Sequence, residues 1–127
     1  MPKILVVDDE RDVVTLLKFV LEKEGHSVSQ AYNGVQALEK LGVDPVDDKA
    51  ELPDLIVLDV MMPIMDGHTT ARHIADHERT SKVPIVVLTA KGQMRDLFDS
   101  IGNVASYLEK PFDPRRLREM VASILGL

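Results

Sequence analysis

The sequence predicts an α/β fold in which a parallel sheet is covered by helices on both faces. Short apolar runs of four or five residues, typical of buried strands, alternate with segments whose apolar residues recur every three or four positions. This order of strand and helix repeats five times along 127 residues, the length of one ordinary domain. Such a sheet is doubly wound, and its ligands bind at the carboxyl ends of the strands.

The first half of the chain contains three predicted strands, over residues 4–7, 27–31 and 55–58. A helix follows the first strand and stops at Gly25, and a short helix over 34–41 follows the second strand. The apolar stripe of the first helix consists of Val13, Leu16, Leu17, Val20 and Leu21. Prolines, acids and the lack of a helical or strand period predict a long exposed loop between the second helix and the third strand, from Gly42 to Pro53.

The second half of the chain contains two further strands and three helices. They are predicted over 67–79 (helix), 84–88 (strand), 93–101 (helix), 105–108 (strand) and from Asp113 to the C-terminus (helix). The last helix has the clearest start, because Asp113 is a favoured N-cap and Pro114 suits the first helical position. We therefore expect a single domain over residues 1–127.

Composition disfavours several classes of function. Acidic residues outnumber basic ones 21 to 15, and the net charge of −6 argues against direct binding of nucleic acid. The chain has no cysteine, which excludes disulfides, thiolate metal sites and thiol catalysis. Its apolar runs are far shorter than the roughly 20 residues of a membrane span, so we expect a cytoplasmic protein without membrane contact. The turn after the first strand is acidic rather than glycine-rich, which disfavours a dinucleotide site.

Polar side chains stand at the carboxyl ends of four predicted strands. Asp8 and Asp9 follow the first strand, Asp59 follows the third, Thr89 follows the fourth, and Lys110 lies just past the fifth. In a parallel sheet these residues meet in one cluster. Crowded carboxylates repel one another, and a divalent cation relieves that repulsion. Oxygen ligands favour Mg²⁺ or Mn²⁺ over zinc, so we expect the metal between Asp9, Asp59 and a backbone carbonyl.

The same cluster has the parts needed to accept a phosphoryl group. The Asp59 carboxylate is the predicted nucleophile, and its attack on phosphorus would form an acyl phosphate. Lys110 would pair with one phosphoryl oxygen, and the Thr89 hydroxyl would donate a hydrogen bond to another.

Each of these residues has an ordinary structural interpretation when it is taken alone. Either acid after the first strand is a favoured helix cap, Asp59 is of a type common in turns, and an isolated Lys110 is most often solvated. The functional prediction therefore rests on the conjunction of all of them. His73 and His77 lie four residues apart on a predicted helix, but no third ligand accompanies them, so we interpret them as exposed surface residues.

Taken together, these motifs resemble the receiver domain of two-component response regulators, similar to the stand-alone chemotaxis-type regulators. The resemblance covers nearly the whole chain and rests on Asp8-Asp9, on Asp59 with Met61-Met62-Pro63 and Met65-Asp66-Gly67, on Thr89-Ala90, on Tyr107, and on Lys110-Pro111-Phe112. It implies a flavodoxin-like sheet with strand order 2-1-3-4-5, five helices and a cis peptide before Pro111.

The resemblance also implies the role of each residue in the site. Asp59 is the implied phosphoacceptor, Asp8 and Asp9 are the acidic metal residues, and the fourth protein ligand is the backbone carbonyl of Met61. Thr89 and Lys110 are the implied phosphate contacts. Met61 and Lys91 occupy positions that influence phosphate lifetime in the family. An apolar Met61 would not orient a water molecule, which favours slow hydrolysis.

A conformational switch is a further implication of the resemblance. Thr89 would move toward the phosphate while Tyr107 turns inward, and the surface around 93–101, 105–108 and the last helix would change. The predicted output face consists of Met94, Phe98, Tyr107, Arg115, Arg116 and Arg118.

The resemblance implies a histidine kinase or a histidine phosphotransfer protein as the phosphoryl donor. A downstream protein or an effector domain outside this sequence would receive the signal, and a phosphorylation-dependent homodimer stays open. Two other classes of function also stay open. A metal-dependent phosphotransferase or phosphatase is disfavoured because no second acid stands two residues after Asp59. An interaction module without phosphorylation is disfavoured because every residue of the phosphorylation set is present.

Overall fold

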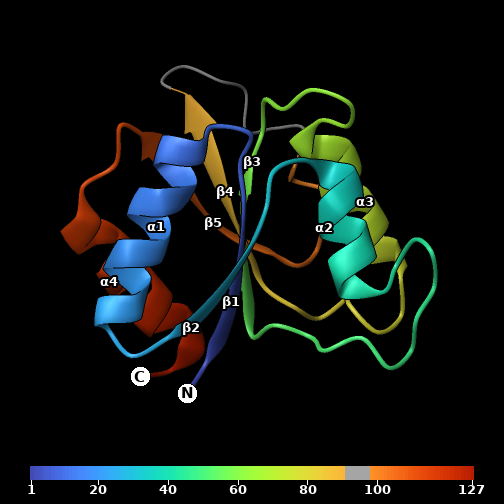
Figure 1. The fold of residues 1–127 in the computed structure, drawn as a ribbon, viewed down its shortest axis with the longest axis horizontal. Helices are drawn as coiled ribbons and strands as arrows, with labels where there is room; N and C mark the ends of the chain where they lie inside the picture. The colour runs from blue at the N-terminus through green and yellow to red at the C-terminus, as the bar shows by residue number, and fades with distance from the viewer. Residues whose placement is uncertain (91–97) are drawn as a thin grey trace.

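The computed structural model describes residues 1–90 and 98–127. At its centre lies a five-stranded parallel sheet with the order β2-β1-β3-β4-β5 (Figure 1). The strands are β1 (Lys3–Val7), β2 (Ser27–Ala31), β3 (Leu55–Asp59), β4 (Ile85–Ala90) and β5 (Val104–Lys110). The labelled helices are α1 (Arg11–Lys23), α2 (Gly34–Leu41), α3 (Gly67–Asp76) and α4 (Pro114–Leu125). The predicted α/β class and strand order are confirmed.

The predicted helix over 93–101 overlaps the part of the chain that is not described. Its residues 93–97, including Met94, lie outside the described residues, as does Lys91. Phe98 to Ile101 form a tight turn in which the Ile101 N–H donates to the Phe98 carbonyl at 3.0 Å. The label α4 therefore belongs to the last helix of the chain.

Burial distinguishes the inner strands from the edge strands. The apolar runs of β1, β3 and β4 are buried almost throughout, because both faces of the sheet are covered. In each of the edge strands β2 and β5 a single residue is buried, and the others are half-buried or exposed. This difference explains why the inner strands stand out in the sequence as continuous apolar runs.

Two separate cores flank the sheet. Helices α1 and α4 cover one face and α2 and α3 cover the other, as Figure 1 shows. Because successive side chains of a strand point to opposite faces, neighbours in each run belong to different cores. Ile4 and Val6 of β1 pack under α1 and α4, whereas Leu5 and Val7 pack under α2 and α3.

Three of the helices in the described residues begin with a side-chain cap. Asn33, Asp66 and Asp113 accept hydrogen bonds from backbone N–H groups in the first turns of α2, α3 and α4. The predicted start of the last helix at Asp113 and Pro114 is confirmed. At α1 the N-cap is Glu10, without a side-chain hydrogen bond, rather than either aspartate before it.

Helix α3 is shorter than predicted. It ends at Asp76, three residues before the predicted end at Arg79. The Thr80 hydroxyl donates to the Ile74 carbonyl at 2.7 Å, which satisfies a group that a further helical turn would have bonded. Arg79 reaches away from the helix and donates to two carbonyl groups of the 42–53 loop.

The 42–53 loop lies at the amino ends of the strands, opposite the predicted site (Figure 1). Arg79 donates to the carbonyl oxygens of Asp47 and Ala50 at 3.0 and 2.7 Å. Lys3 forms an ion pair with Glu51 on the same side of the molecule. The loop is exposed over most of its length, as predicted, and contacts of its residues 47–51 fasten it to the domain.

The last two strands are longer than predicted. β4 extends to Ala90, so Thr89 lies within the strand, and β5 runs from Val104 to Lys110. The pairing register between them shifts near Ala105, because Val104 pairs with Ile85 while Ser106 pairs with Val86. This irregularity obscures the alternation by which the start of β5 would be recognised. The peptide bond before Pro111 is cis, as predicted.

None of the helices in the described residues has the length and apolar character that a membrane crossing requires.

Candidate functional site

The alternation of side chains along the strands brings the predicted site together. Asp8 follows β1 on the α1 and α4 side of the sheet, and Asp59 closes β3 on the same side. Lys110 ends β5 two residues after Leu108, which also packs on that side. Residues far apart in the sequence therefore share one face at the carboxyl end of the sheet.

Lys110 is the centre of this cluster. Its Nζ lies 2.7 Å from Oδ2 of Asp8 and 3.2 Å from Oδ1 of Asp59. Both carboxylates are buried, with side chains 0% and 6% exposed, whereas Lys110 retains 20% exposure. A third acid, Glu10, reaches the same ammonium from the surface at 3.6 Å. Among the described residues one cation therefore faces three acids, so their summed charge is negative.

Burial and crowding change the proton affinities in the pocket. Burial, the charge of Asp8 and that of Asp9 raise the pKa of Asp59 from 3.8 to about 6, although Lys110 opposes them. Burial likewise raises the pKa of Asp8 above its ordinary value, against hydrogen bonds from Lys110 and from the Glu10 N–H. The Asp59 carboxylate is still mostly ionised at neutral pH, the form that a nucleophile requires.

Burial has the opposite effect on the ammonium of Lys110, but it does not determine the outcome. Burial alone would lower the pKa of Lys110, but the hydrogen bond to Asp8 and the charges of Asp59 and Asp8 outweigh it. The pKa of Lys110 is therefore raised above its ordinary value, and the group stays charged at physiological pH.

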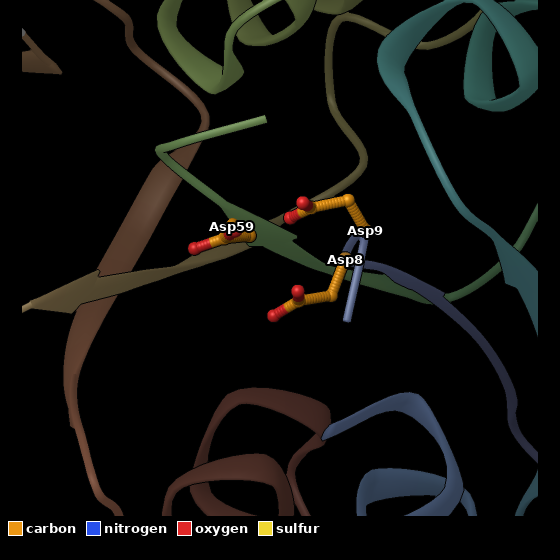
Figure 2. A group of neighbouring side chains, drawn as sticks. All are labelled: Asp8, Asp9 and Asp59. Atoms are coloured by element: carbon orange, nitrogen blue, oxygen red, sulfur yellow. The ribbon is translucent and has the colours of Figure 1, made fainter. Parts of the chain in front are cut away.

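The carboxylates of Asp8, Asp9 and Asp59 suit a small divalent cation. One oxygen of each lies within 4.8 Å of the others, and Figure 2 shows the three side chains gathered at the ends of β1 and β3. Asp9 is exposed while the other two are buried, which leaves one side of the group open to water. Oxygen donors with room for water match the coordination of Mg²⁺. His73 and His77 belong to no such group within the described residues.

Thr89 points to the other face of the sheet from Asp59. It follows Leu88, which packs under α1 and α4, so its side chain emerges on the α2 and α3 side. The hydroxyl is buried, and within the described residues its Oγ1 has no hydrogen-bond partner. A buried hydroxyl without a partner is uncommon, and a phosphoryl oxygen at Asp59 would provide the missing acceptor once the Thr89 side chain turned toward it.

The predicted output face requires one correction. Phe98 is only 1% exposed and belongs to the core under α2 and α3, so it cannot contact a partner directly. Its helical spacing is equally compatible with a core position, which is why the sequence did not decide between them. Tyr107, half-buried on the same side, packs against this core with its ring 6.3 Å from that of Phe98.

The three arginines of the predicted output face lie on or beside α4. Arg115 and Arg116 are exposed, and Arg118 forms an ion pair with Glu24, at the end of α1, with its Nε 3.4 Å from the carboxylate. Met61 is 67% exposed immediately beyond the site. Met94 and Lys91 are outside the described residues.

Two residues of the site were assigned no role from the sequence. Glu10 is a third partner of Lys110, and its place in the acidic run Asp8-Asp9-Glu10 was the available signal. At Gly67 a Cβ atom would collide with the carbonyl oxygen of Asp59 and lie 2.7 Å from Cα of Val60. The glycine therefore lets the start of α3 press against the backbone of the candidate nucleophile.

Comparison with known proteins agrees with this geometry. A family model described as the response regulator receiver domain matches residues 4–122. The chain is 38% identical over 128 residues to the "DNA-binding dual master transcriptional regulator RpaA" of Synechocystis, covering 100% of this chain and 49% of that protein. The chain thus spans about half the length of the curated relatives that it matches.

Solved structures show the same likeness. The chemotaxis protein CheY4 of Vibrio cholerae superposes with a TM-score of 0.85 at 25% identity, covering 98% of both chains. The receiver domain of the sensor histidine kinase PA1611 of Pseudomonas aeruginosa superposes with a TM-score of 0.82 at 27% identity, covering 99% of this chain and 98% of that one. That structure holds a magnesium ion in its active-site cleft.

Proposed function

Because this chain belongs to the response regulator receiver family, we propose that it is a phosphorylation switch in which Asp59 accepts a phosphoryl group. It is a signalling domain rather than a conventional enzyme, and its acidic pocket is typical of Mg²⁺-dependent phosphoaspartate switches. The observation that carries the proposal is the placement of Lys110 between the two buried carboxylates of Asp8 and Asp59.

In the proposed reaction an oxygen of the Asp59 carboxylate attacks the phosphorus of the donor. A new P–O bond forms while the bond between phosphorus and the leaving group breaks, and its electron pair stays with the leaving group, which then takes up a proton. The product is an acyl phosphate on Asp59. At neutral pH the carboxylate is mostly ionised despite its raised pKa, so attack needs no prior loss of a proton.

The neighbouring side chains stabilise the added charge. Lys110 is 3.2 Å from Asp59 Oδ1, and its ammonium would pair with a phosphoryl oxygen once the acyl phosphate has formed. The Thr89 hydroxyl, which has no partner in the described part of the chain, would donate to a second oxygen. Its movement toward the phosphate would free space beside Tyr107 on the same face of the sheet.

The pocket would hold Mg²⁺ through Asp8, Asp9 and Asp59 together with the backbone carbonyl of Met61, and Mn²⁺ can substitute. When bound, the ion supplies positive charge that offsets the acids and the phosphoryl oxygens. Met61 is apolar and exposed and cannot orient a water molecule by hydrogen bonding, so we propose slow hydrolysis of the phosphate.

A sensor histidine kinase or a histidine phosphotransfer protein is the proposed donor, as in two-component systems generally. The chain covers about half of RpaA, which is described as DNA-binding, so a DNA-binding effector domain would suit the remaining half of a longer protein. In that arrangement this acidic domain makes no direct contact with DNA. We propose a cytoplasmic location and a phosphorylation-dependent homodimer through the surface around β5 and α4, including Arg115.

Intact-mass measurement tests the proposal. Incubation with Mg²⁺ and a small phosphodonor such as acetyl phosphate should add one phosphoryl group, which is lost in alkali and is not formed by Asp59→Asn. Turnover of many donor molecules per protein would instead indicate a phosphatase or phosphotransferase. Absence of any adduct in the wild-type protein, with several donors, would indicate an interaction module that is not phosphorylated.

A further inference from the structure

Helix α3 begins in direct contact with the backbone of the phosphoacceptor. The Gly67 N–H donates to the Val60 carbonyl at 2.8 Å, and there is no room for a Cβ between Gly67 and the Asp59 carbonyl oxygen. A shift of the backbone at the end of β3 therefore cannot be absorbed locally and must move the first turn of α3. The next residue in that turn is His68.

His68 and Arg72 connect α3 to the turn that starts at Phe98. The imidazole of His68 meets the ring of Phe98 edge to face, with centroids 5.4 Å apart and an interplanar angle of 76°. One helical turn later, Nη2 of Arg72 lies 2.7 Å from Oγ of Ser100. Two contacts on one face of the helix thus fix the position of this turn relative to α3.

Phe98 in turn contacts Tyr107, the tyrosine of the proposed switch. Its ring is 1% exposed and meets the ring of Tyr107 with centroids 6.3 Å apart and an angle of 76°. His68, Phe98 and Tyr107 therefore form a continuous aromatic row from the start of α3 to β5. Edge-to-face pairs of this kind have a preferred geometry, so displacing one ring changes the packing of the next.

We propose that His68 is a positioning residue of the switch, which holds Phe98 against Tyr107 and so makes the conformation of Tyr107 depend on α3. The inference rests on the proposed function, because it gives the phosphorylated Asp59 a second route to Tyr107. The first route runs through Thr89, on the strand next to β5. The second route runs from Gly67 through the aromatic row. The close approach of Gly67 to Asp59 and the two ring contacts of Phe98 join its residues.

The tyrosine content of the chain provides a specific probe. The sequence has two tyrosines and no tryptophan, so Tyr32→Phe leaves Tyr107 as the single tyrosine. Phenylalanine retains the ring over which the Arg11 guanidinium lies, 4.3 Å from the centroid. Incorporation of 3-fluorotyrosine into this variant reports the two environments of Tyr107 by ¹⁹F NMR, before and after phosphorylation with Mg²⁺ and acetyl phosphate.

His68→Leu should change the ratio of the two Tyr107 environments by about two- to thirty-fold in the phosphorylated protein. His73→Leu is the matched control, because it replaces an exposed histidine of the same helix, and it should leave the ratio unchanged. In a Phe98→Leu background, His68→Leu should have much less effect, because the ring through which it acts is gone. Thermal unfolding of every variant identifies losses of stability that are unrelated to Tyr107.

The outcomes separate the inference from the proposed function. If intact mass shows the phosphoryl group on Asp59 but His68→Leu leaves the Tyr107 ratio unchanged, the inference is wrong and the phosphorylation switch stands. An equal effect of His68→Leu with and without Phe98 would also overturn it, since the row would not be the route. If the wild-type protein forms no adduct, both the proposed function and the inference fail.

Discussion

The ammonium of Lys110 is the shared ion-pair partner of several acids. Asp8 and Asp59 approach its ammonium at 2.7 and 3.2 Å, and Glu10 follows at 3.6 Å. Removing both buried carboxylates from water is costly, and a single ammonium offsets only part of that cost. The raised pKa of Asp59 is the measurable sign of this imbalance. The same excess of negative charge gives a divalent cation its affinity for the pocket.

The pH dependence of stability follows from the raised pKa of Asp59. A folded-state pKa of about 6 against an ordinary 3.8 means that the folded protein holds this proton more tightly than the unfolded chain. Without metal, the free energy of unfolding should therefore fall as pH rises from about 4 to about 6. At about 1.4 kcal/mol per pH unit, the loss attributable to Asp59 is at most about 3 kcal/mol.

Urea unfolding between pH 4 and pH 8 in the presence of EDTA measures this effect. Asp59→Asn should show a smaller loss over the same range and should be more stable than the wild type at pH 7. Adding Mg²⁺ should restore stability to the wild type at pH 7 far more than at pH 4.5. Equal pH profiles for the two proteins would show that Asp59 is not the group with the raised pKa.

At the scale of the elements, the close approach of α3 to β3 depends on one glycine. Gly67→Ala would place a methyl group against the Asp59 carbonyl oxygen and the Cα of Val60, both of which are backbone atoms with little freedom to move. The substitution should lower the free energy of unfolding by about 1–3 kcal/mol. It should also slow phosphorylation of Asp59, because α3 and the end of β3 can no longer adopt their present positions.

Gly102→Ala is the matched control for this prediction. A Cβ at Gly102 meets no atom within 4 Å, and its backbone is not in the left-handed region. Its unfolding free energy should change by no more than about 0.5 kcal/mol. Chemical denaturation and the initial rate of adduct formation measure both variants. Gly67→Ala with wild-type stability and wild-type rate would mean that the start of α3 can move aside freely.

Elements whose signals are local could be predicted from the sequence. The inner strands were recognisable because both of their faces are buried, and the last helix because Asp113 and Pro114 mark its start. The end of α3 could not be predicted, because it depends on the Thr80 hydroxyl and on contacts of Arg79 with a loop about 30 residues away in the sequence. The start of β5 was obscured by a register shift that exists only in the assembled sheet.

The candidate site, too, could be predicted from the sequence only in part. Asp8, Asp59 and Lys110 could be predicted to meet, because the carboxyl ends of parallel strands share one edge and alternation gives the face. The role of Glu10 depends on the length and direction of a side chain, and that of His68 on a contact with Phe98 across thirty positions. Pairings of this kind leave no periodic signal in a single sequence.

On the scale of the whole molecule, the two ends of the sheet have different roles. The carboxyl ends bear the acidic site, whereas the amino ends bear the 42–53 loop, which Arg79 and Lys3 fasten to the domain (Figure 1). The face formed by β5 and α4 lies beside the site and presents the exposed Arg115 and Arg116. In the proposed switch, a signal created at Asp59 would reach this surface through β4 and β5 and through the aromatic row from His68, without passing through the loop.

The central claim is that side chains from four strand ends form one pocket that holds a phosphoryl group on Asp59. A crystal structure with Mg²⁺ and beryllium trifluoride, which mimics an acyl phosphate, tests it most directly. We predict that the trifluoride is bonded to an Asp59 carboxylate oxygen, with Lys110 Nζ and Thr89 Oγ1 in hydrogen-bond contact with its fluorines and the metal on Asp9. A mimic bound elsewhere, or Lys110 and Thr89 both out of reach of it, would contradict the account.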